Sequence, residues 1–256
     1  MTLQACAEIT RRGDPDRFLA AMTTPPEARK ILFPLYAFNV EVSRAPWVTE
    51  EPMIAEMRLQ FWRDVAEEIG QGKPPRAHEV AEPLTDIIDP KDAPLLDAMA
   101  AARRWDIYKN AFEDAAHFDN YIDATSGNLT WLAAKTLGAP DATEPTIRAQ
   151  ARASGLANFL RAIPALEDKG RIPLLDGTPQ GVRTLAEDGL QALTDARRAR
   201  AKIPKPATYA LYAGWRAEPI LKAARDVPER VIEGKLDESE FARRARLIWV
   251  SSTGRW

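Results

Sequence analysis

The sequence predicts an all-α protein in which residues 1–256 form a single domain. Apolar residues recur at steps of three and four along most of the chain, which is the spacing of one helix face. No segment alternates apolar and polar residues between hairpin turns, as half-buried strands do. No repeat, low-complexity tract or linker divides the chain, and 256 residues can bury a substantial core.

Helical spacing is clearest in residues 26–44 and 50–69. The first segment carries an apolar stripe, and Pro34 within it is expected to kink or break the helix. The second begins near Pro52, stops at Gly70 and carries an apolar face of its own. The stripe comprises Ile31, Leu32, Leu35, Phe38 and Val42, and the second face comprises Met53, Met57, Phe61, Val65 and Ile69. Both are expected to pack into the core.

Prolines and glycines divide the remaining sequence. Several prolines between positions 74 and 94 predict short helices and turns. Residues 95–137 predict one or two long helices, and residues 143–163 predict a helix that Pro164 ends. Glycines and prolines make residues 167–179 a loop. Three further helices are expected, at residues 182–202, 206–226 and 237–251.

Composition excludes several classes of function. The chain has 35 Lys and Arg against 37 Asp and Glu, so its net charge of −2 gives no global reason to expect nucleic acid as a partner. The single cysteine, Cys6, excludes an intrachain disulfide and a Cys-rich zinc site. His78 and His117 lie far apart in sequence, which gives poor support to zinc chemistry or a His-dependent triad. His117 remains a lone acid or base candidate.

The chain has no apolar run of the roughly 18 to 20 residues that a membrane span needs. Its first residues also lack the basic and apolar regions of a signal peptide. We therefore expect a cytoplasmic protein, or one that lies peripherally on the inner membrane face if the cell is bacterial. Trp249 and Trp256, near the end of the sequence, are expected to pack on the preceding helix rather than to anchor in a membrane.

Residues 155–174 read GLANFLRAIPALEDKGRIPL and resemble the second signature of the squalene/phytoene synthase family. In that signature a helix carrying asparagine, arginine and two aspartates runs into a Gly-Arg loop. The matching residues Asn158, Arg161, Gly170 and Arg171 keep the spacing of the signature. The two aspartate positions hold Ala162 and Leu166.

Residues 28–44 resemble the first signature of the same family. Tyr36, Ala37 and Phe38 fit it, but the acidic positions that follow hold neutral or basic residues, namely Ser43, Arg44 and Trp47. Residues 120–138 resemble the family's helix that lines the substrate tunnel. Together with the string MRLQFWRDVAEEI, these segments are most similar to the branch that contains a mitochondrial assembly factor for respiratory complex I, which also lacks the aspartates.

The resemblance implies an isoprenoid-synthase-like helical bundle around a central cavity. In active members Mg²⁺ bound to the aspartates neutralises the departing diphosphate, and Mg²⁺ requires oxygen ligands that Ala162 and Leu166 lack. The absence of these aspartates therefore implies that the protein has no catalytic residue, no metal site and no cofactor. The implied function is assembly of respiratory complex I at the membrane surface, with complex I subunits as partners and an isoprenoid or lipid as ligand.

Two alternatives stay open. One is an active head-to-head synthase of the phytoene or squalene type, which would need Mg²⁺ held by divergent ligands. The other is a cytoplasmic scaffold without a small ligand. The aromatic residues on the presumed inner helices border a cavity in the family, although for each of them a packed core is the simpler expectation.

The candidate anion or ligand-binding residues are Tyr36, Asn158, Arg161 and Arg171, because arginine matches phosphate oxygens in pairs. The alternative is that both arginines are exposed or pair with the acidic residues 167 and 168. A displaced metal pair, Asp119 and Asp123, is also a candidate, since residues four apart share a helix face. Acidic pairs on amphipathic helices are, however, usually solvated.

Overall fold

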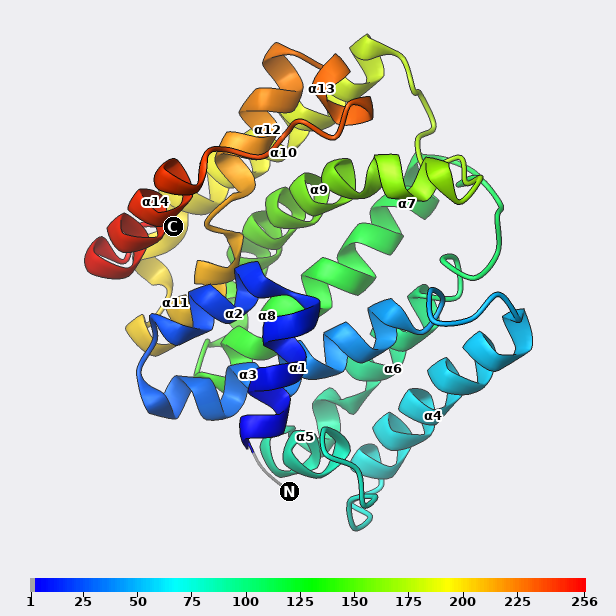
Figure 1. The fold of residues 1–256 in the computed structure, drawn as a ribbon. Coiled ribbons are helices and arrows are strands. Elements are labelled where there is room, and N and C mark those ends of the chain that lie inside the picture. Colours follow the sequence, from blue (N-terminus) through cyan, green and yellow to red (C-terminus); the bar gives the residue numbers. More distant parts are fainter. Residues whose placement is uncertain (1–2) are drawn as a thin grey trace.

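The computed structural model describes residues 3–256, and within that range it contains helices, turns and loops but no strand (Figure 1). The predicted all-α class is confirmed. The helices are α1 Leu3–Gly13, α2 Pro15–Met22, α3 Pro26–Arg44, α4 Pro52–Gly70, α5 Ala81–Ile87, α6 Ala93–Ala102, α7 Ala115–Ile122, α8 Asn128–Thr136, α9 Glu144–Asp168, α10 Pro179–Ala199, α11 Lys205–Leu211, α12 Ala217–Asp226, α13 Glu229–Ile232 and α14 Glu240–Thr253. None of these helices is both long enough and apolar enough to cross a membrane.

Local sequence signals explain several helix ends. Before α2, the Asp14 carboxylate accepts the Arg17 backbone N–H, and proline occupies the first helical position. Thr178 and Ser239 cap α10 and α14 in the same way through their hydroxyl groups. Gly254 follows α14 with a φ of 66°, in the left-handed region that favours glycine.

The buried apolar side chains form two clusters. The first includes residues of α1, α3, α4, α6, α8 and α11, with Leu32, Phe38, Leu59, Trp62 and Leu132 among its members. The second includes residues of α7, α9, α10 and α12, with Phe118, Leu160, Ile163, Val182 and Ile220 among its members. In Figure 1, α7 and α8 run through the middle of the bundle, between α3 and α6 on one side and α9 on the other. The candidate site lies where the two clusters meet.

A π-helical turn, Asp123–Gly127, joins α7 to α8 without a break in the helical path. Such turns often mark functional sites. Gly155 of α9 packs directly against it, because a Cβ atom at Gly155 would lie 2.8 Å from the Ser126 Oγ and 2.9 Å from the Ile122 Cγ2. A glycine is therefore needed for the close approach of α9 to the central helix.

Gly155→Ala is expected to lower the free energy of unfolding by about 1–2 kcal/mol, because the cost of overpacking exceeds the better helix propensity of alanine. Gly70→Ala is the matched control, since its Cβ would lie at an ordinary 3.5 Å from the Ala93 Cβ. The control should be neutral or slightly stabilising. Equilibrium urea unfolding measures both. Equal effects of the two substitutions would contradict the close contact.

The prediction that Pro164 ends a helix is wrong, and Pro34 does not break α3. Helix α3 continues through Pro34, and α9 continues through Pro164 to Asp168. In each case buried residues follow the proline, including Leu35 in α3 and Leu166 in α9. Burial of these side chains compensates for the backbone hydrogen bond that proline removes.

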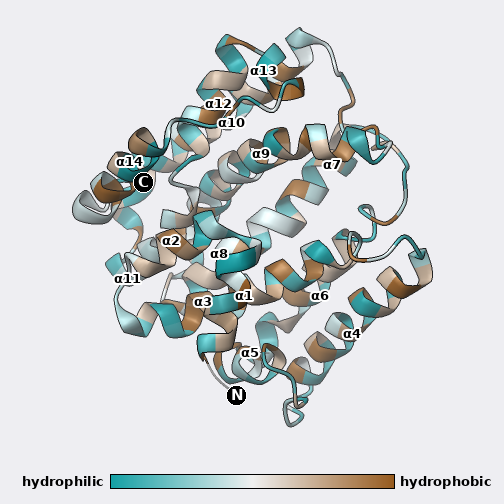
Figure 2. Cartoon of the chain, in the orientation of Figure 1, coloured by the Kyte–Doolittle hydropathy of each residue, from teal (hydrophilic) through white to brown (hydrophobic). Residues whose placement is uncertain are grey.

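The predicted apolar face of α4 is wrong in its first half. Met53 and Met57 are mostly exposed, and Figure 2 colours this end of α4 as hydrophobic. The buried face instead runs through Ala55, Leu59 and Trp62 before it includes the expected Val65 and Ile69. Both registers have helical spacing, and packing against α6 selects the second one.

Other boundaries also differ from expectation. Residues 103–114 form turns and loop rather than helix, so the central helical run starts only at Ala115. The segment 206–226 is divided between α11 and α12 by a 3-10 turn, Tyr212–Gly214. The short helix α13 had no sequence signal. The helix over residues 26–44 is confirmed, and the predicted loop at 167–179 is confirmed for residues 169–178.

Candidate functional site

Two adjoining pockets lie between α3, the central helical run and α9. The larger has a volume of about 470 Å³ and extends toward the start of α2 and the segments before α12 and α14. The smaller, of about 360 Å³, extends between the end of α3, α7 and the end of α9. Residues that line both are Ser43, Arg103, Ser126, Asn158 and Ala162. The expected central cavity thus corresponds to two connected hollows.

The smaller pocket brings the two sequence signatures face to face. Ser43 and Trp47, from the first signature, and Ala162 and Leu166, from the second, all line it. Each stands at a position where the resemblance leads one to expect an acid. Within residues 3–256, no group of three or more His, Cys, Asp or Glu side chains is arranged to hold a metal ion. The four side chains at the expected acidic positions offer one hydroxyl oxygen among them, which does not fit Mg²⁺, because this ion needs several oxygen ligands.

A buried polar cluster supplies charge to the smaller pocket. The Arg103 Nη1 donates to the Tyr121 hydroxyl at 2.8 Å and to the Asp106 carboxylate at 3.2 Å. The Tyr121 hydroxyl donates in turn to Asp106 at 3.0 Å. Burial is the main cause that raises the pKa of Tyr121, so it stays a neutral donor. Arg103 lines both pockets, so its guanidinium supplies positive charge to each of them.

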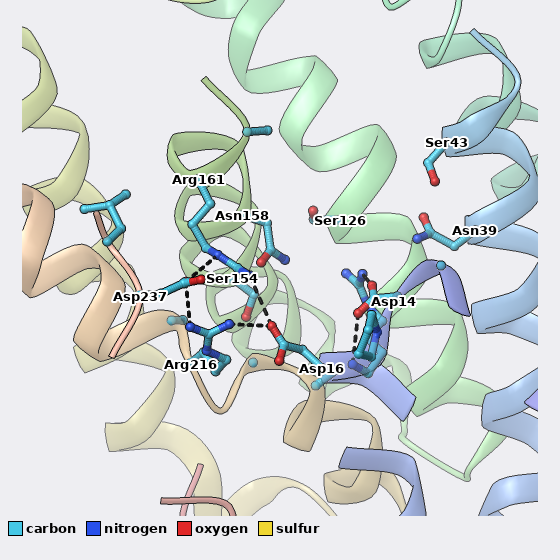
Figure 3. A pocket seen from close by; sticks show the side chains of 18 of the residues that line it. Asp14, Asp16, Asn39, Ser43, Ser126, Ser154, Asn158, Arg161, Arg216 and Asp237 are labelled. Atoms are coloured by element: carbon cyan, nitrogen blue, oxygen red, sulfur yellow. Dashed lines mark hydrogen bonds and ion pairs between the residues drawn. The ribbon is translucent and has the colours of Figure 1, made fainter. Parts of the chain in front are cut away.

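The larger pocket contains an ion network centred on Asp16 of α2 (Figure 3). The Asp16 carboxylate accepts hydrogen bonds from Arg161 at 3.1 Å, from Arg216 at 2.6 Å and from Arg243 at 2.8 Å. Asp237 also pairs with two of these arginines, at 3.0 Å from Arg161 and 2.7 Å from Arg216. Residues of α2, α9, α14 and the segments before α12 and α14 are thus connected at one point.

The electrostatics of this network are dominated by Asp16 and the buried Arg216. Burial is the largest single influence on Asp16 and raises its pKa, but Arg216, Arg161 and Arg243 together outweigh burial, so the net pKa is lowered. Arg216 has only 4% of its side chain exposed. A carboxylate in this position is therefore required to compensate the buried guanidinium.

Three of the predicted ligand residues lie at or near the larger pocket. Asn158 and Arg161 line it and project from α9 (Figure 3). Tyr36 is buried and does not line either pocket, but its ring lies 5.9 Å from the guanidinium carbon of Arg17, which does line the larger one. The alternative pairing of Arg161 with residues 167 and 168 is wrong, because its partners are Asp16 and Asp237.

The structure places Arg171 outside both pocket linings. Its guanidinium donates to the backbone carbonyls of Trp105, Asp106 and Tyr108, and it packs over the rings of Trp47 and Trp105. Arg171 thus ties the loop after α9 to the turn after α6. These bonds satisfy carbonyl groups in a segment that is not helical.

The acidic pair of the central helix is occupied by arginines of α9. Asp119 accepts from Arg152 at 2.8 Å, and Asp123 accepts from Arg148 at 2.9 Å. Neither carboxylate lines either pocket, and both are about half exposed. These two ion pairs connect α9 to the central helix. They give no support to the predicted displaced metal pair.

The predicted inner aromatics mostly pack against one another. Trp105 stacks on Phe112, with ring centroids 4.1 Å apart, and Phe112 makes edge contacts with Phe118 and Tyr121. Tyr121 and Phe159 also line the smaller pocket, so they border a hollow and a core at once. The expectation of a packed core is confirmed for this cluster.

Comparison with known proteins gives both a family and a set of relatives. The chain is 27% identical to NADH dehydrogenase (ubiquinone) complex I assembly factor 6 of Bos taurus, over 65% of this chain and 51% of that protein. It is 28% identical to the human factor, over 62% of this chain and 48% of that protein, and 29% identical to the homolog of Drosophila melanogaster, over 62% and 50%. The chain spans about half the length of these relatives.

Solved structures show the same fold at low sequence identity. A dehydrosqualene synthase in complex with ligand has a TM-score of 0.82 at 15% identity, over 98% of this chain and 95% of that one. Squalene synthase HpnC from Alicyclobacillus acidocaldarius has a TM-score of 0.73 at 16% identity, over 88% and 93%. The model of the squalene/phytoene synthase family matches residues 10–174, which is more than half of the sequence. With both signature segments inside that match, the chain belongs to the squalene/phytoene synthase family.

Proposed function

We propose that this protein is a non-catalytic member of its family that acts in the assembly of respiratory complex I, with complex I subunits as partners, at the membrane surface. The observation that carries the proposal is the smaller pocket, where Ser43, Trp47, Ala162 and Leu166 stand in place of acids. The relatives named as complex I assembly factors support the choice of process.

The loss of acids from the pocket bears directly on chemistry. Ionisation of an allylic diphosphate requires its departing negative charge to be neutralised, and a lost electrostatic clamp costs several kcal/mol of transition-state stabilisation. Arg103 is present in the pocket, but Asp106 and the Tyr121 hydroxyl already engage its guanidinium. We infer that the pocket recognises a ligand without activating a leaving group.

The proposed ligand is an isoprenoid or lipid with an anionic headgroup. Arg17, Arg103, Ser126 and Asn158 supply polar groups around the larger pocket. Tyr121, Ile122, Phe159 and Leu166 supply apolar surface in the smaller one. An anionic head in the larger pocket and an apolar chain in the smaller one would match this division, and arginine needs no metal to bind phosphate.

Farnesyl and geranylgeranyl diphosphate are expected to bind with the same dissociation constant in Mg²⁺ and in EDTA, because arginines rather than a metal ion provide the positive charge. Isothermal titration calorimetry measures both conditions. An active family synthase, whose affinity should depend on Mg²⁺, is the matched control. Failure of both diphosphates to bind, or binding only with Mg²⁺, would contradict the proposed ligand class.

The second candidate function is an active synthase with divergent metal ligands. Purified protein incubated with farnesyl or geranylgeranyl diphosphate and Mg²⁺ should release no pyrophosphate above a protein-free control. Robust release would overturn the non-catalytic proposal in favour of this candidate.

The assembly role is tested in cells that make the protein and contain complex I. A deletion strain should keep its normal isoprenoids but lose complex I activity, and the wild-type gene should restore it. Unchanged complex I activity in the deletion strain would sink the assembly role, and altered isoprenoids would point to synthesis.

A further inference from the structure

Helix α14 turns an apolar face away from the bundle. Phe241 is 83% exposed, Ile248 is 65% exposed and Trp249 is 49% exposed. Phe241 and Ile248 are seven residues apart, so they lie two turns apart on the same face. In Figure 1, α14 lies at the edge of the molecule, and Figure 2 shows hydrophobic and hydrophilic turns along it.

The opposite side of α14 holds the helix in place. Val250 is buried in the first cluster, and Arg243 donates to Asp16 at 2.8 Å. Trp256 is buried, and its carbonyl oxygen accepts from the Arg197 Nε at 2.9 Å. The expected packing is therefore confirmed for Trp256, whereas Trp249 stays half exposed beside Ile248. The outward residues are not needed to attach α14.

Positive charge gathers beside this apolar face. Arg244 is largely exposed on α14 and pairs with Glu240, one turn before it, at 2.9 Å. The segment 197–205, which the bond from Arg197 to Trp256 connects to the end of the chain, reads RRARAKIPK and contains five basic residues and no acid. Lys202 and Lys205 in that segment are exposed. Glu218 and Asp195 pair with Arg197 and Arg198, so the positive charge of this segment rests on Arg200, Lys202 and Lys205.

We propose that α14 and the segment 197–205 form a docking surface for an anionic lipid bilayer. Phe241, Ile248 and Trp249 enter the interfacial layer, while the exposed Lys202 and Lys205 contact headgroup phosphates. A basic amphipathic helix with aromatic residues on its apolar face is the arrangement that binds such a surface. The proposal deepens the membrane-surface action proposed above and is independent of any pocket ligand.

A second exposed apolar surface, on α4, is less suited to an anionic bilayer. Met53 and Met57 on α4 follow the exposed Glu50 and Glu51, which would repel anionic headgroups. The two surfaces are otherwise comparable, since both present large apolar side chains on a helix. The α4 methionines therefore provide a matched comparison for the test.

The test is co-sedimentation of the full chain with phosphatidylcholine vesicles, with or without phosphatidylglycerol. Wild type should bind only the vesicles that contain phosphatidylglycerol, and high salt should weaken binding. The combined variant Phe241→Ser, Ile248→Ser and Trp249→Ser should lose binding, whereas the variant Met53→Ser and Met57→Ser should keep it. Far-UV circular dichroism and thermal unfolding check that both variants fold like wild type.

Tryptophan fluorescence gives a second measurement. Wild type should show a blue shift when phosphatidylglycerol vesicles are added, and Trp249→Phe should largely remove it. The proposal is overturned if wild type does not bind, if the α14 variant binds like wild type, or if only the α4 variant loses binding, as a different membrane or protein contact would require. Vesicle binding that depends on α14 while a deletion strain keeps normal complex I activity would instead overturn the assembly role alone.

Discussion

Asp16→Asn is expected to lower the free energy of unfolding by about 3 kcal/mol, because it removes the main negative partner of the buried Arg216. Asparagine keeps the size of the side chain but not the charge. Arg161 and Arg243 lose a partner in the same step. Urea unfolding at neutral pH measures the difference from wild type.

Asp237→Asn is the matched control for this network. Asp237 also contacts Arg161 and Arg216, but 54% of its side chain is exposed, so water screens the charge. Its replacement should cost only about 0–1 kcal/mol. Equal losses for the two variants would show that burial of the Arg216 guanidinium does not set the cost.

The contribution of Asp16 to the free energy of unfolding should decrease as the pH falls into the acid range. Its pKa is lowered in the folded state, since the three arginines outweigh burial, so its stabilisation is fully present above the unfolded pKa of about 4. That stabilisation is lost as the pH falls through the lower, folded pKa. Wild type and Asp16→Asn should therefore converge in stability on acidification below about pH 4. A constant difference across the acid range would contradict the ionised role of Asp16.

The sequence was sufficient for the features that depend on local spacing. The limits of α3 follow from prolines before it and a continuous apolar stripe within it. The face of α4 did not follow, because two registers fit its first half and only contact with α6 distinguishes them. The start of α7 was also missed, because tertiary bonds to Arg171 hold the preceding turn.

Part of the candidate site could likewise be predicted from local sequence, and part of it depends on contacts between distant residues. Ser43, Trp47, Ala162 and Leu166 were identified because two local signatures assign positions to them, and the smaller pocket brings them together. The Asp16 network was missed, because Asp16 and Arg216 are 200 positions apart and neither has a local signal. Arg103 and Asp106 have a helical spacing of three, which is a weak signal among many charged pairs.

Arg103→Met is expected to lower the free energy of unfolding by about 3 kcal/mol, because Asp106 is buried and keeps only a neutral hydroxyl as a side-chain partner. Tyr121→Phe, which removes a hydroxyl from the same cluster, should cost about 1 kcal/mol.

The double variant Arg103→Met and Asp106→Asn tests whether the unpaired carboxylate causes the loss. Removing both charges should cost less than the sum of the single changes, with a coupling of about 1–3 kcal/mol in urea unfolding. Additive losses would mean that Arg103 stabilises the fold by packing alone. Because Arg103 also lines both pockets, folded Arg103→Met protein should bind farnesyl diphosphate more weakly than folded Tyr121→Phe protein. The same guanidinium would then serve two purposes, since it neutralises a buried acid and donates hydrogen bonds to a bound diphosphate.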